Sequence, residues 1–379
     1  MKLAIIGGGA SGLMLASIIR RHNKNIEIVI LEKLEHVGKK ILMSGNGKCN
    51  LTNANIVSNC YNNEFAYKVA SSFDANKYFN ELGLLTYQDN EGRIYPISNV
   101  ANSVLDVLRN SLTDVDILTN YNVTRVVKKN NKFVITNDAF KTIEADIVVM
   151  ATGGKTYYKE NNSYLMCSML SHRITPLRPT LTSLKIAENL ASIENLRAKV
   201  NAKLISNNNV IYEDKGEVLF KKDALSGIVI FQLSSYVARD PMKKYSVELD
   251  LMPSMSEEEL EKYLTAYPNM TGLFAKMINQ YILKTSASKD VKDIAYNIKH
   301  LRFNVLDSVE FKNAQVTAGG LNINEVNEHM ESKYHNNLYI VGELLDVDGI
   351  CGGYNLHFAF ASAYKAALDI LEKVGKNNG

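Results

Sequence analysis

The sequence predicts an α/β fold in which a parallel sheet of the Rossmann type is interrupted by a β-rich and helical insertion. The chain opens with an apolar strand, residues 2–6, that runs into Gly7-x-Gly9-x-x-Gly12 and then into an apolar helix. A second strand over residues 26–31 and a buried strand within residues 145–154 are typical of a parallel sheet. Residues 176–303 lack the alternation of strands and helices that this sheet requires, so an insertion is expected there.

The three glycines of the first turn have separate physical roles. Gly7 permits the tight turn from strand to helix, Gly9 keeps side-chain atoms away from a bound anion, and Gly12 lets helix and strand pack closely. The unpaired N–H groups and the dipole at the start of the helix favour a pyrophosphate. Glu32 follows the second strand, where an acid accepts hydrogen bonds from a ribose. A dinucleotide site is therefore expected, and the alternative is a glycine-rich turn in another kind of α/β unit.

The net charge alone indicates neither a nucleic-acid binder nor a membrane binder. The chain has 379 residues, 43 Lys and Arg against 40 Asp and Glu, and a formal net charge of +3. Pairs of lysines at 39–40, 128–129, 221–222 and 243–244 are each more typical of a solvated face than of a phosphate site.

Localisation is expected to be cytoplasmic. The first strand begins at residue 2, which leaves no room for a leader peptide, and no apolar run reaches membrane-spanning length. The four cysteines, at positions 49, 60, 167 and 351, form no CxxC pair, which suits a reducing compartment and argues against a disulfide framework or a zinc site. The spacing of carboxylates and histidines predicts no metal site.

The remaining elements are predicted from local patterns. Residues 38–53 form a Gly- and Asn-rich loop, and Ser256 followed by three glutamates starts a helical region. Helices are expected at 64–88, 99–112, 256–300 and from about 355 to 374; strands are expected at 116–131, 132–137, 197–206, 209–212, 216–220, 245–252, 303–321 and 338–343. Asn130-Asn131 is the expected hairpin turn.

These elements suggest a dinucleotide-binding domain that is split by an insertion. Its first part covers residues 1–175 and its second part 304–379, around a β-rich domain at 176–252 and a helical subdomain at 253–303. The alternative is one large α/β domain with long excursions.

The later strands favour FAD over NAD as the dinucleotide. Residues 151–154 and 317–320 lack the spacing of a second glycine fingerprint, so no separate nicotinamide domain is expected. A strand that ends in Ala151-Thr152-Gly153 and a late strand that ends in Gly342-Glu343 before a helix are typical of flavoproteins of the two-dinucleotide and fumarate-reductase-like groups. Glu343 is expected near the ribityl and pyrophosphate region, and the last helix is expected to point its N-terminus at the flavin.

Five blocks resemble a widespread bacterial flavoprotein family whose members are known as aminoacetone-oxidase-like proteins, bile-acid-pathway reductases or ribosomal-RNA dihydrouridine synthases. The blocks span nearly the whole chain. They are residues 6–16 (IGGGASGLMLA), 38–53 (GKKILMSGNGKCNLTN), 151–154 (ATGG), 216–220 (GEVLF) with 225–227 (LSG), and 316–320 (VTAGG) through 342–356 (GELLDVDGICGGYNL).

The resemblance implies an FAD domain in which residues 44–50 and 346–355 wrap the flavin. The expected cofactor-binding residues are Gly7, Gly9, Ala10, Ser11, Gly12, Glu32, Lys33, Lys40, Ser44, Gly45, Gly47, Lys48, Cys49, Asn50, Ala151, Thr152, Gly153, Gly342, Glu343, Asp348, Gly353, Tyr354 and Asn355. The chain departs from the family pattern at residues 155–164 and 221–228, where Ile228 replaces a usual proline. These departures put the identity of the substrate and the activity itself in doubt, but not the FAD.

Two cysteines are the candidate proton donors for hydride chemistry on the flavin. Cys49 lies in the Gly- and Asn-rich loop beside Lys48, which is expected to tune its pKa, and Cys351 lies in the second wrapping segment. The alternative for Cys49 is a packing role beneath the flavin. Asp346 and Asp348 are expected to cap turns or bind ribityl hydroxyls. Tyr354 and His357 begin the last helix, where His357 is more typical of a satisfied helix-end histidine than of a catalyst.

Three functions follow from the resemblance. The first is an FAD enzyme that reduces an activated C=C bond with electrons from transiently bound NAD(P)H, acting on uridine in large-subunit ribosomal RNA or on a conjugated enone. The second is an oxidase that passes electrons from a small amine to oxygen. The third is an RNA-binding flavoprotein whose FAD is structural.

Overall fold

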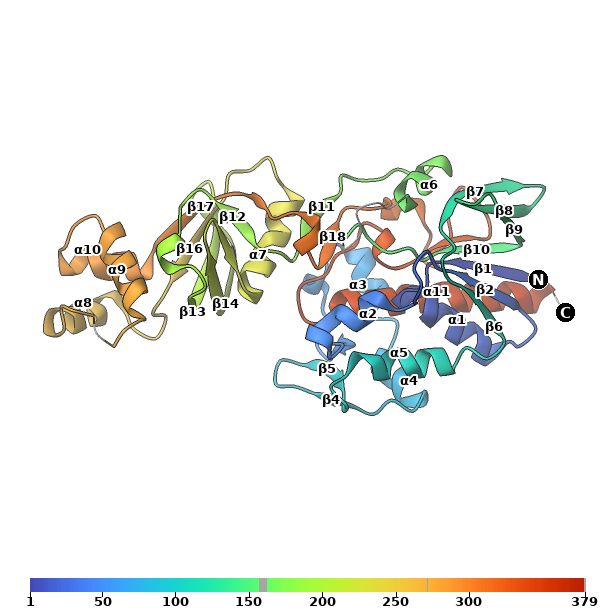
Figure 1. The fold of residues 1–379 in the computed structure, drawn as a ribbon, viewed down its shortest axis with the longest axis horizontal. Helices are drawn as coiled ribbons and strands as arrows, with labels where there is room; N and C mark the ends of the chain where they lie inside the picture. Colours follow the sequence, from blue (N-terminus) through green and yellow to red (C-terminus); the bar gives the residue numbers. More distant parts are fainter. Residues whose placement is uncertain (157–161, 271, 378–379) are drawn as a thin grey trace. The chain divides into compact units, whose positions relative to one another are not determined.

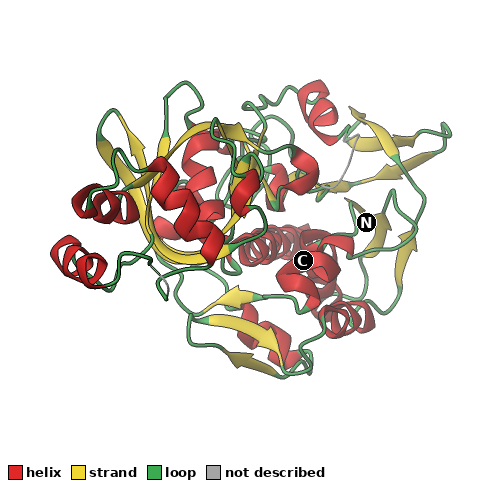
Figure 2. Ribbon diagram, turned by 60° about the vertical axis from the view of Figure 1, so that its left-hand side comes forward, coloured by secondary structure: helices red, strands yellow, loops and turns green. Residues whose placement is uncertain are grey.

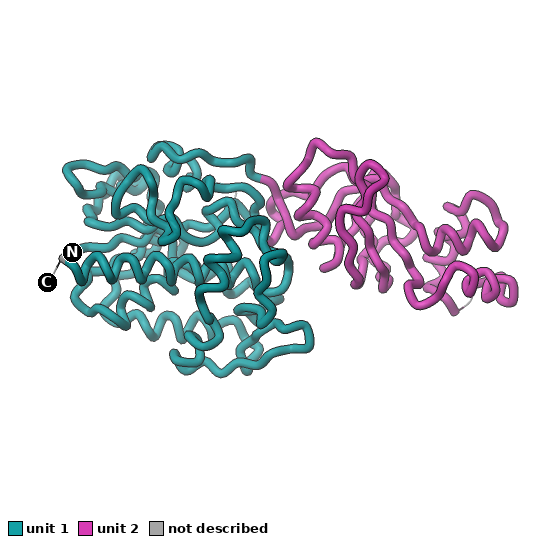
Figure 3. The backbone as a smooth tube through the Cα atoms, turned by 180° about the vertical axis from the view of Figure 1, so that it is seen from behind, with its two compact units in different colours: residues 1–177, 316–379 teal, residues 178–315 magenta. Residues whose placement is uncertain are grey.

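The chain forms two compact units, each with its own hydrophobic core. A computed structural model describes residues 1–156, 162–270 and 272–377. Unit 1 comprises Met1–Leu177 and Val316–Gly379, and unit 2 comprises Arg178–Gln315 (Figure 3). The insertion expected from residue 176 thus begins at residue 178. The return expected at residue 304 lies instead at Val316, because the strand β17 (Leu301–Ser308) pairs on both sides with strands of unit 2.

A five-stranded parallel sheet forms the centre of unit 1, as the sequence predicts. The strand order is β19-β10-β1-β2-β6, and every neighbouring pair is parallel. The strands are β1 (Lys2–Ile6), β2 (Glu27–Leu31), β6 (Val115–Leu118), β10 (Ile147–Met150) and β19 (Leu338–Ile340). The segment 116–131, expected as one strand, is two: β6 completes the sheet, and the chain turns at Asn120 with φ 52° before the next strand begins.

Helices cover one face of this sheet and a small antiparallel sheet covers the other (Figure 1). The helices α1 (Ala10–His22), α5 (Ala101–Asn110) and α11 (Tyr354–Asn377) pack together. The small sheet consists of β7 (Val123–Lys129), β8 (Lys132–Asn137) and β9 (Thr142–Ala145). Asn130 and Asn131 form the predicted turn between β7 and β8, both with positive φ, as a two-residue hairpin requires.

The segment between β2 and α5 forms an arm of short elements beside the sheet. The helix expected over residues 64–88 is broken, because Asp74 starts a new helix by accepting a hydrogen bond from the Lys77 N–H. The arm contains α2 (Lys39–Met43), β3 (Thr52–Asn53), α3 (Glu64–Ala70), α4 (Ala75–Glu81), β4 (Thr86–Gln88) and β5 (Arg93–Pro96). The three strands form one antiparallel sheet in the order β3-β5-β4.

Unit 2 is a closed six-stranded barrel with helices beside it (Figure 2). The barrel order is β12-β15-β14-β13-β16-β17, with β12 (Leu184–Ile186), β13 (Arg197–Ser206), β14 (Asn209–Lys221), β15 (Ala224–Ser226) and β16 (Ser246–Asp250). The strands expected at 209–212 and 216–220 are one continuous strand, β14. The helices are α7 (Ile228–Arg239), α8 (Glu257–Ala266), α9 (Lys276–Thr285) and α10 (Val291–Lys299).

Three short elements complete the fold: α6 (Ser163–Met169), β11 (Arg178–Thr180) and β18 (Val316–Ala318). Residues 157–161, within the segment that departs from the family pattern, lie outside the described residues. Among the described residues, no helix combines the length and apolar character that crossing a membrane would require.

Replacing Ser256 with alanine should locally destabilise α8. Ser256 accepts a hydrogen bond from the Glu259 N–H at 3.1 Å, and the Glu259 side chain accepts one from the Ser256 N–H at 2.7 Å. Loss of this capping box should cost about 1 kcal/mol. Amide hydrogen exchange in α8 should therefore become faster in Ser256→Ala than in Ser254→Ala, an exposed control two residues earlier. Equal exchange in both variants would contradict the role of the cap.

Candidate functional site

The carboxyl ends of β1, β2, β10 and β19 meet at one edge of the sheet, where the predicted glycine turn lies. Gly7 has a φ of 109°, and a Cβ on it would overlap the Ala151 carbonyl. A Cβ on Gly12 would overlap the Gly7 carbonyl, so close packing of helix on strand excludes a side chain there. No described atom lies within 4 Å of the position that a Cβ on Gly9 would take. The turn is thus closely packed on both sides and open above Gly9.

The N-terminus of α1 above this turn suits an anion. Gly9 is the N-cap residue, no side chain of the described residues caps the helix there, and the first turn contains no acid. Its backbone N–H groups and the helix dipole therefore present positive partial charge to the open space. Ser11 is buried, and its hydroxyl lies where a Cβ on Gly342 would stand, so the start of α1 also packs against the end of β19.

Glu32 is fixed at the end of β2 by two backbone donors. Its Oε2 accepts a hydrogen bond from the Gly8 N–H at 2.8 Å, and its Oε1 accepts one from the Leu34 N–H at 2.9 Å. The side chain is 8% exposed. Each carboxylate oxygen can accept a second hydrogen bond, so Glu32 is oriented to receive the hydroxyls of a ribose at the position that the sequence predicts.

Lysines concentrate positive charge beside the glycine turn. Burial is the main cause that lowers the pKa of Lys33; Glu32 opposes the shift, and the charges of Lys40 and Lys39 add to it. Like charges this close repel one another. An anion at the turn would relieve that repulsion, which fits the phosphate-binding role expected of this region.

Lys40 and Glu343, both predicted to bind the cofactor, form an ion pair with each other. Lys40 Nζ lies 2.9 Å from Glu343 Oε2 and donates a second hydrogen bond to the Thr156 hydroxyl at 3.0 Å. Glu343 Oε1 accepts a hydrogen bond from the Thr317 N–H at 2.9 Å. The sequence analysis did not assign Thr156 or Thr317 to the site, although Thr156 closely follows segment 151–154 and Thr317 lies within segment 317–320, both of which it singled out.

The loop that carries Ser44, Gly45, Gly47 and Lys48 is largely exposed, whereas Cys49 and Asn50 at its end are buried. Cys49 belongs to the core of unit 1 and has a positive φ of 57°. Burial raises the pKa of its thiol to about 12, and a hydrogen bond with Ser44 offsets only part of that effect. The expectation that Lys48 tunes this pKa is therefore wrong, because desolvation dominates. Burial in the core is compatible with a packing role for Cys49, and its position beneath the flavin stays a prediction.

The second wrapping segment is held in place by Asn62 and Thr175, which the sequence analysis did not identify, and by Asn355, which it did. Asn62 exchanges hydrogen bonds with the backbone of Asp348, through its own N–H at 3.0 Å and its side-chain oxygen at 3.2 Å. Asn355 accepts from the Gly349 N–H and donates to the Gly349 carbonyl, each at 2.8 Å. Asp346 accepts from the Thr175 hydroxyl at 2.7 Å. The predicted side chain of Asn355 therefore fixes the backbone of the segment, and Cys351 within it is half-buried.

Tyr354 and His357 are engaged with the protein itself. The Tyr354 hydroxyl donates to the Asn55 carbonyl at 3.1 Å, and burial is the main cause that raises its pKa above the usual range. His357 Nδ1 lies 2.7 Å from the Thr52 hydroxyl and Nε2 lies 2.9 Å from the Ala70 carbonyl. Since a carbonyl only accepts, Nε2 carries the proton and Nδ1 accepts from Thr52. His357 is a satisfied, neutral helix-end histidine, and burial lowers its pKa.

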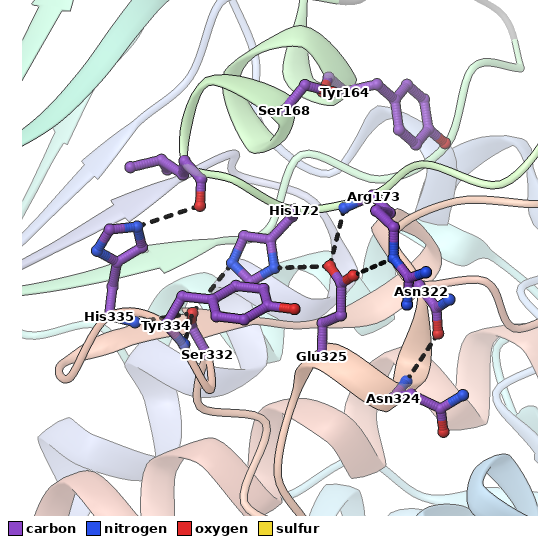
Figure 4. A network of polar contacts seen from close by, with 11 residues as sticks. Tyr164, Ser168, His172, Arg173, Asn322, Asn324, Glu325, Ser332, Tyr334 and His335 are labelled. Atoms are coloured by element: carbon purple, nitrogen blue, oxygen red, sulfur yellow. Dashed lines mark hydrogen bonds and ion pairs between the residues drawn. The ribbon is translucent and has the colours of Figure 1, made fainter.

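A buried polar network lies elsewhere in unit 1, around His172 (Figure 4). His172 Nε2 lies 3.0 Å from the Ser332 hydroxyl, and Nδ1 lies 3.3 Å from Glu325 Oε2. This order of Ser, His and Glu matches that of an acyl-transfer triad. However, all three side chains are at most 4% exposed, and the Ser332 oxygen already accepts from the N–H groups of Tyr334 and His335.

The network instead fixes the segment before residue 178. Glu325 accepts from the Arg173 N–H at 2.8 Å and from the Arg173 guanidinium at 2.7 Å. The Asn322 N–H donates to the Arg173 carbonyl at 3.0 Å. This bond again joins the segment around Arg173 to the segment around Glu325. We therefore assign this network to stability and not to catalysis.

The edge of the sheet fits a dinucleotide. The open space above Gly9, the uncapped helix, the oriented Glu32 and the lysine cluster provide the diphosphate and ribose contacts that such a ligand requires. These features come from this chain's own geometry and agree with the cofactor class that the sequence predicts.

Comparisons with known proteins identify the family to which the chain is similar. Residues 1–369 match the family described as HI0933-like protein Rossmann domain. The chain is 34% identical to the 3-dehydro-bile acid delta(4,6)-reductase of Clostridium scindens, with 98% of this chain and 99% of that protein covered. It is 25% identical to the ribosomal RNA dihydrouridine synthase of Haemophilus influenzae, with 97% of each chain covered.

A solved structure shares the fold. The 3-ketosteroid delta1-dehydrogenase from Sterolibacterium denitrificans superimposes with a TM-score of 0.52 at 11% identity, covering 98% of this chain and 99% of that one. Similarity at this level of identity bears on the fold alone.

The cysteines should differ in their reaction with iodoacetamide. Cys49 is fully buried with a raised pKa, and Cys167 is fully buried with its pKa raised to about 12, whereas Cys351 is half-buried. Because the thiolate is the nucleophile, we expect Cys351 to be alkylated first at pH 8 and Cys49 only after unfolding. Peptide mass spectrometry measures this order, with urea-unfolded protein as the control. Rapid alkylation of Cys49 in the folded protein would contradict the burial argument.

The His172 network should make the protein less stable in acid. Burial lowers the pKa of His172 below 6.5, so the unfolded chain takes up protons first as the pH falls. The contribution of neutral His172 to the free energy of unfolding is complete above about pH 6.5, and it declines as the pH falls through the pKa that His172 has in the folded protein. Burial alone would raise the pKa of Glu325, but hydrogen bonds from Arg173 and His172 hold it below 4.5, so its contribution declines only below that value.

Urea unfolding at several pH values tests this network. Between pH 7.5 and about pH 5, the free energy of unfolding of the wild type should fall more than that of His172→Asn, which has no imidazole to titrate. If the free energy of unfolding had the same pH dependence in both proteins, titration of His172 would not be the cause of the lower stability in acid.

Proposed function

We propose a function from the premise that the chain belongs to the HI0933-like Rossmann-domain family. The protein is an FAD-dependent oxidoreductase that reduces an activated C=C bond, with NAD(P)H as the transient electron donor. The first choice of substrate is a conjugated enone, and the second is uridine in large-subunit ribosomal RNA.

One observation carries this proposal. The sheet edge with its open Gly9 turn, bounded by Glu32, is a dinucleotide site within a chain that aligns end to end with a named enone-type reductase at 34% identity. The dihydrouridine synthases align over the same length at 24–25% identity. Both kinds of relative are named for reduction of a C=C bond conjugated to a carbonyl, so the reaction class is supported more strongly than either substrate.

The chain's residues would perform the binding part of this reaction. Bound FAD supplies the hydride for one carbon of the double bond, and a proton must reach its neighbour. The Gly7–Gly12 turn and the start of α1 hold the diphosphate, and Glu32 holds a ribose. Asn62 and Asn355 hydrogen-bond the backbone of Asp348 and Gly349 and would thereby hold residues 346–355 against the flavin, where the segment would shield the ring from water and orient it.

Burial reduces the number of predicted side chains that could donate the proton. Cys49 has a pKa of about 12, and the Tyr354 hydroxyl is already bonded to a backbone carbonyl. His357 is neutral and hydrogen-bonded at both nitrogens. Of the predicted donors, Cys351 is the one that keeps solvent access, so we assign the proton to Cys351 or to water beside it.

Anaerobic spectroscopy of the FAD-loaded protein tests the reaction. NADH or NADPH should bleach the oxidised flavin band, and a 3-oxo-4,6-diene steroid should restore it with a product two hydrogens heavier by mass spectrometry. If no nicotinamide donor reduces the flavin and no enone or uridine acceptor reoxidises it, the proposal fails. Peroxide formed with aminoacetone in the absence of NAD(P)H would instead support the oxidase.

The Glu32→Ala variant tests the binding site itself. Loss of the hydrogen bonds between a charged acceptor and a ribose should weaken FAD binding by about tenfold to a hundredfold. The exposed neighbour Glu35→Ala is the matched control and should bind FAD as the wild type does. Fluorescence titration of the apoprotein with FAD measures both values, and equal affinities would place the dinucleotide elsewhere.

The RNA substrate has a separate test. Nucleoside mass spectrometry of large-subunit ribosomal RNA from a deletion strain should show loss of dihydrouridine, restored by the gene, if uridine is the substrate. Unchanged dihydrouridine would leave the enone as the substrate class. Salt-sensitive binding to ribosomal RNA fragments that persists with a flavin that cannot be reduced would support the RNA-binding alternative.

A further inference from the structure

The Lys40 side chain crosses the edge of the sheet where the cofactor is expected. Lys40 belongs to α2, which follows β2, whereas Glu343 follows β19 at the other end of the sheet order. Between them stand β1 and β10, and Lys40 Nζ lies 3.7 Å from the position of a Cβ on Gly153, just after β10. The ion pair therefore bridges the carboxyl ends of the strands between β2 and β19.

The pair is embedded in a set of backbone contacts that fix the Glu343 carboxylate. A Cβ on Gly154 would overlap this carboxylate, so the chain after β10 lies directly against it. The Lys155 N–H donates to the Thr317 hydroxyl at 2.9 Å, and the Thr317 N–H donates to Glu343. The side chains of Lys40 and Glu343 are 24% and 19% exposed. Screening is thus reduced but not absent, and an unpaired carboxylate here would repel a nearby anion.

We propose that Lys40 is a positioning residue that acts on the flavin cofactor through Glu343, by neutralising and orienting that carboxylate, rather than as a direct ligand of the phosphates. This inference rests on the proposed FAD site. Without Lys40, the charge of Glu343 would oppose both the cofactor's diphosphate and the negative charge that reduced flavin carries. With Lys40, the carboxylate is available as a neutralised hydrogen-bond acceptor at the end of β19.

The surrounding charges support this assignment. Lys39 and Lys40 both lie close enough to Lys33 for their charges to lower its pKa, so Lys33 and Lys39 would keep positive charge near the glycine turn without Lys40. The charge of Glu343 adds to the burial that raises the pKa of Tyr164, which places the carboxylate near this buried side chain. Lys40 is a cationic partner of that carboxylate, in addition to the Thr317 N–H.

A double-mutant cycle separates the two roles of Lys40. Lys40→Met, Glu343→Gln and the double variant are prepared as apoproteins and titrated with FAD by fluorescence. We expect Lys40→Met to weaken FAD binding by about tenfold in the wild-type background. In the Glu343→Gln background the same change should alter affinity by less than about twofold, because no carboxylate remains to be neutralised. Lys39→Met is the control that removes one charge from the same helix but not from the pair.

The midpoint potential of the bound flavin provides a readout that does not depend on turnover. Lys40→Met should make the potential more negative, and the shift should disappear in the Glu343→Gln background. A Lys40→Met effect of equal size in both backgrounds would overturn the proposal and make Lys40 a direct phosphate ligand. If the wild-type protein does not bind FAD at all, the proposed function is wrong. The double-mutant cycle distinguishes that outcome, because neither the wild type nor any variant would then show a fluorescence change on addition of FAD.

Discussion

The structure of unit 1 depends on the close approach of backbone segments at the carboxyl edge of its parallel sheet. Gly7 meets the Ala151 carbonyl, Gly12 meets the Gly7 carbonyl, and Gly154 meets Glu343, each without room for a Cβ. In the segment before α11, Gly353 likewise meets the Thr52 carbonyl. Since backbones pack this tightly only where a side chain is missing, these glycines determine where the helices begin and where space remains for a ligand. The ion pair of Lys40 and Glu343 and the orientation of Glu32 are consequences of that packing.

The parts of this architecture that could be predicted are those with a local cause. The glycine turn and the strands around it have distinct periodicity and composition, and the Asn130-Asn131 hairpin and the Ser256 capping box carry their own signatures. The break between α3 and α4 and the split of residues 116–131 escaped prediction. In both, a short polar residue, Asp74 or Asn120, ends one element and starts another within a continuous pattern.

The candidate site was predictable as a set of residues but not as a set of contacts. Lys40 and Glu343 both appear in the sequence as expected cofactor ligands, yet they are 303 positions apart and no local pattern indicates that they pair. Asn62 and Thr317 were missed for the same reason, because their role consists of bonds to backbone groups far along the chain. The register of the parallel sheet brings these positions together. Contacts between residues so far apart in the sequence cannot be predicted from local composition or spacing.

Burial decides what each group at this site can do chemically. A thiol placed in a core and held at a pKa of about 12 can fill space beneath a ring, but it is a poor proton donor at neutral pH. A partly buried carboxylate is stabilised in its ionised form by pairing and hydrogen bonding, and Glu343 has both a lysine and a backbone N–H as partners. The protein thus combines a buried, neutral thiol at Cys49 with a compensated charge at Glu343. The hydride chemistry proposed above would use both, since a flavin ring must be shielded from water while the charge that develops on it must not be opposed by a bare carboxylate.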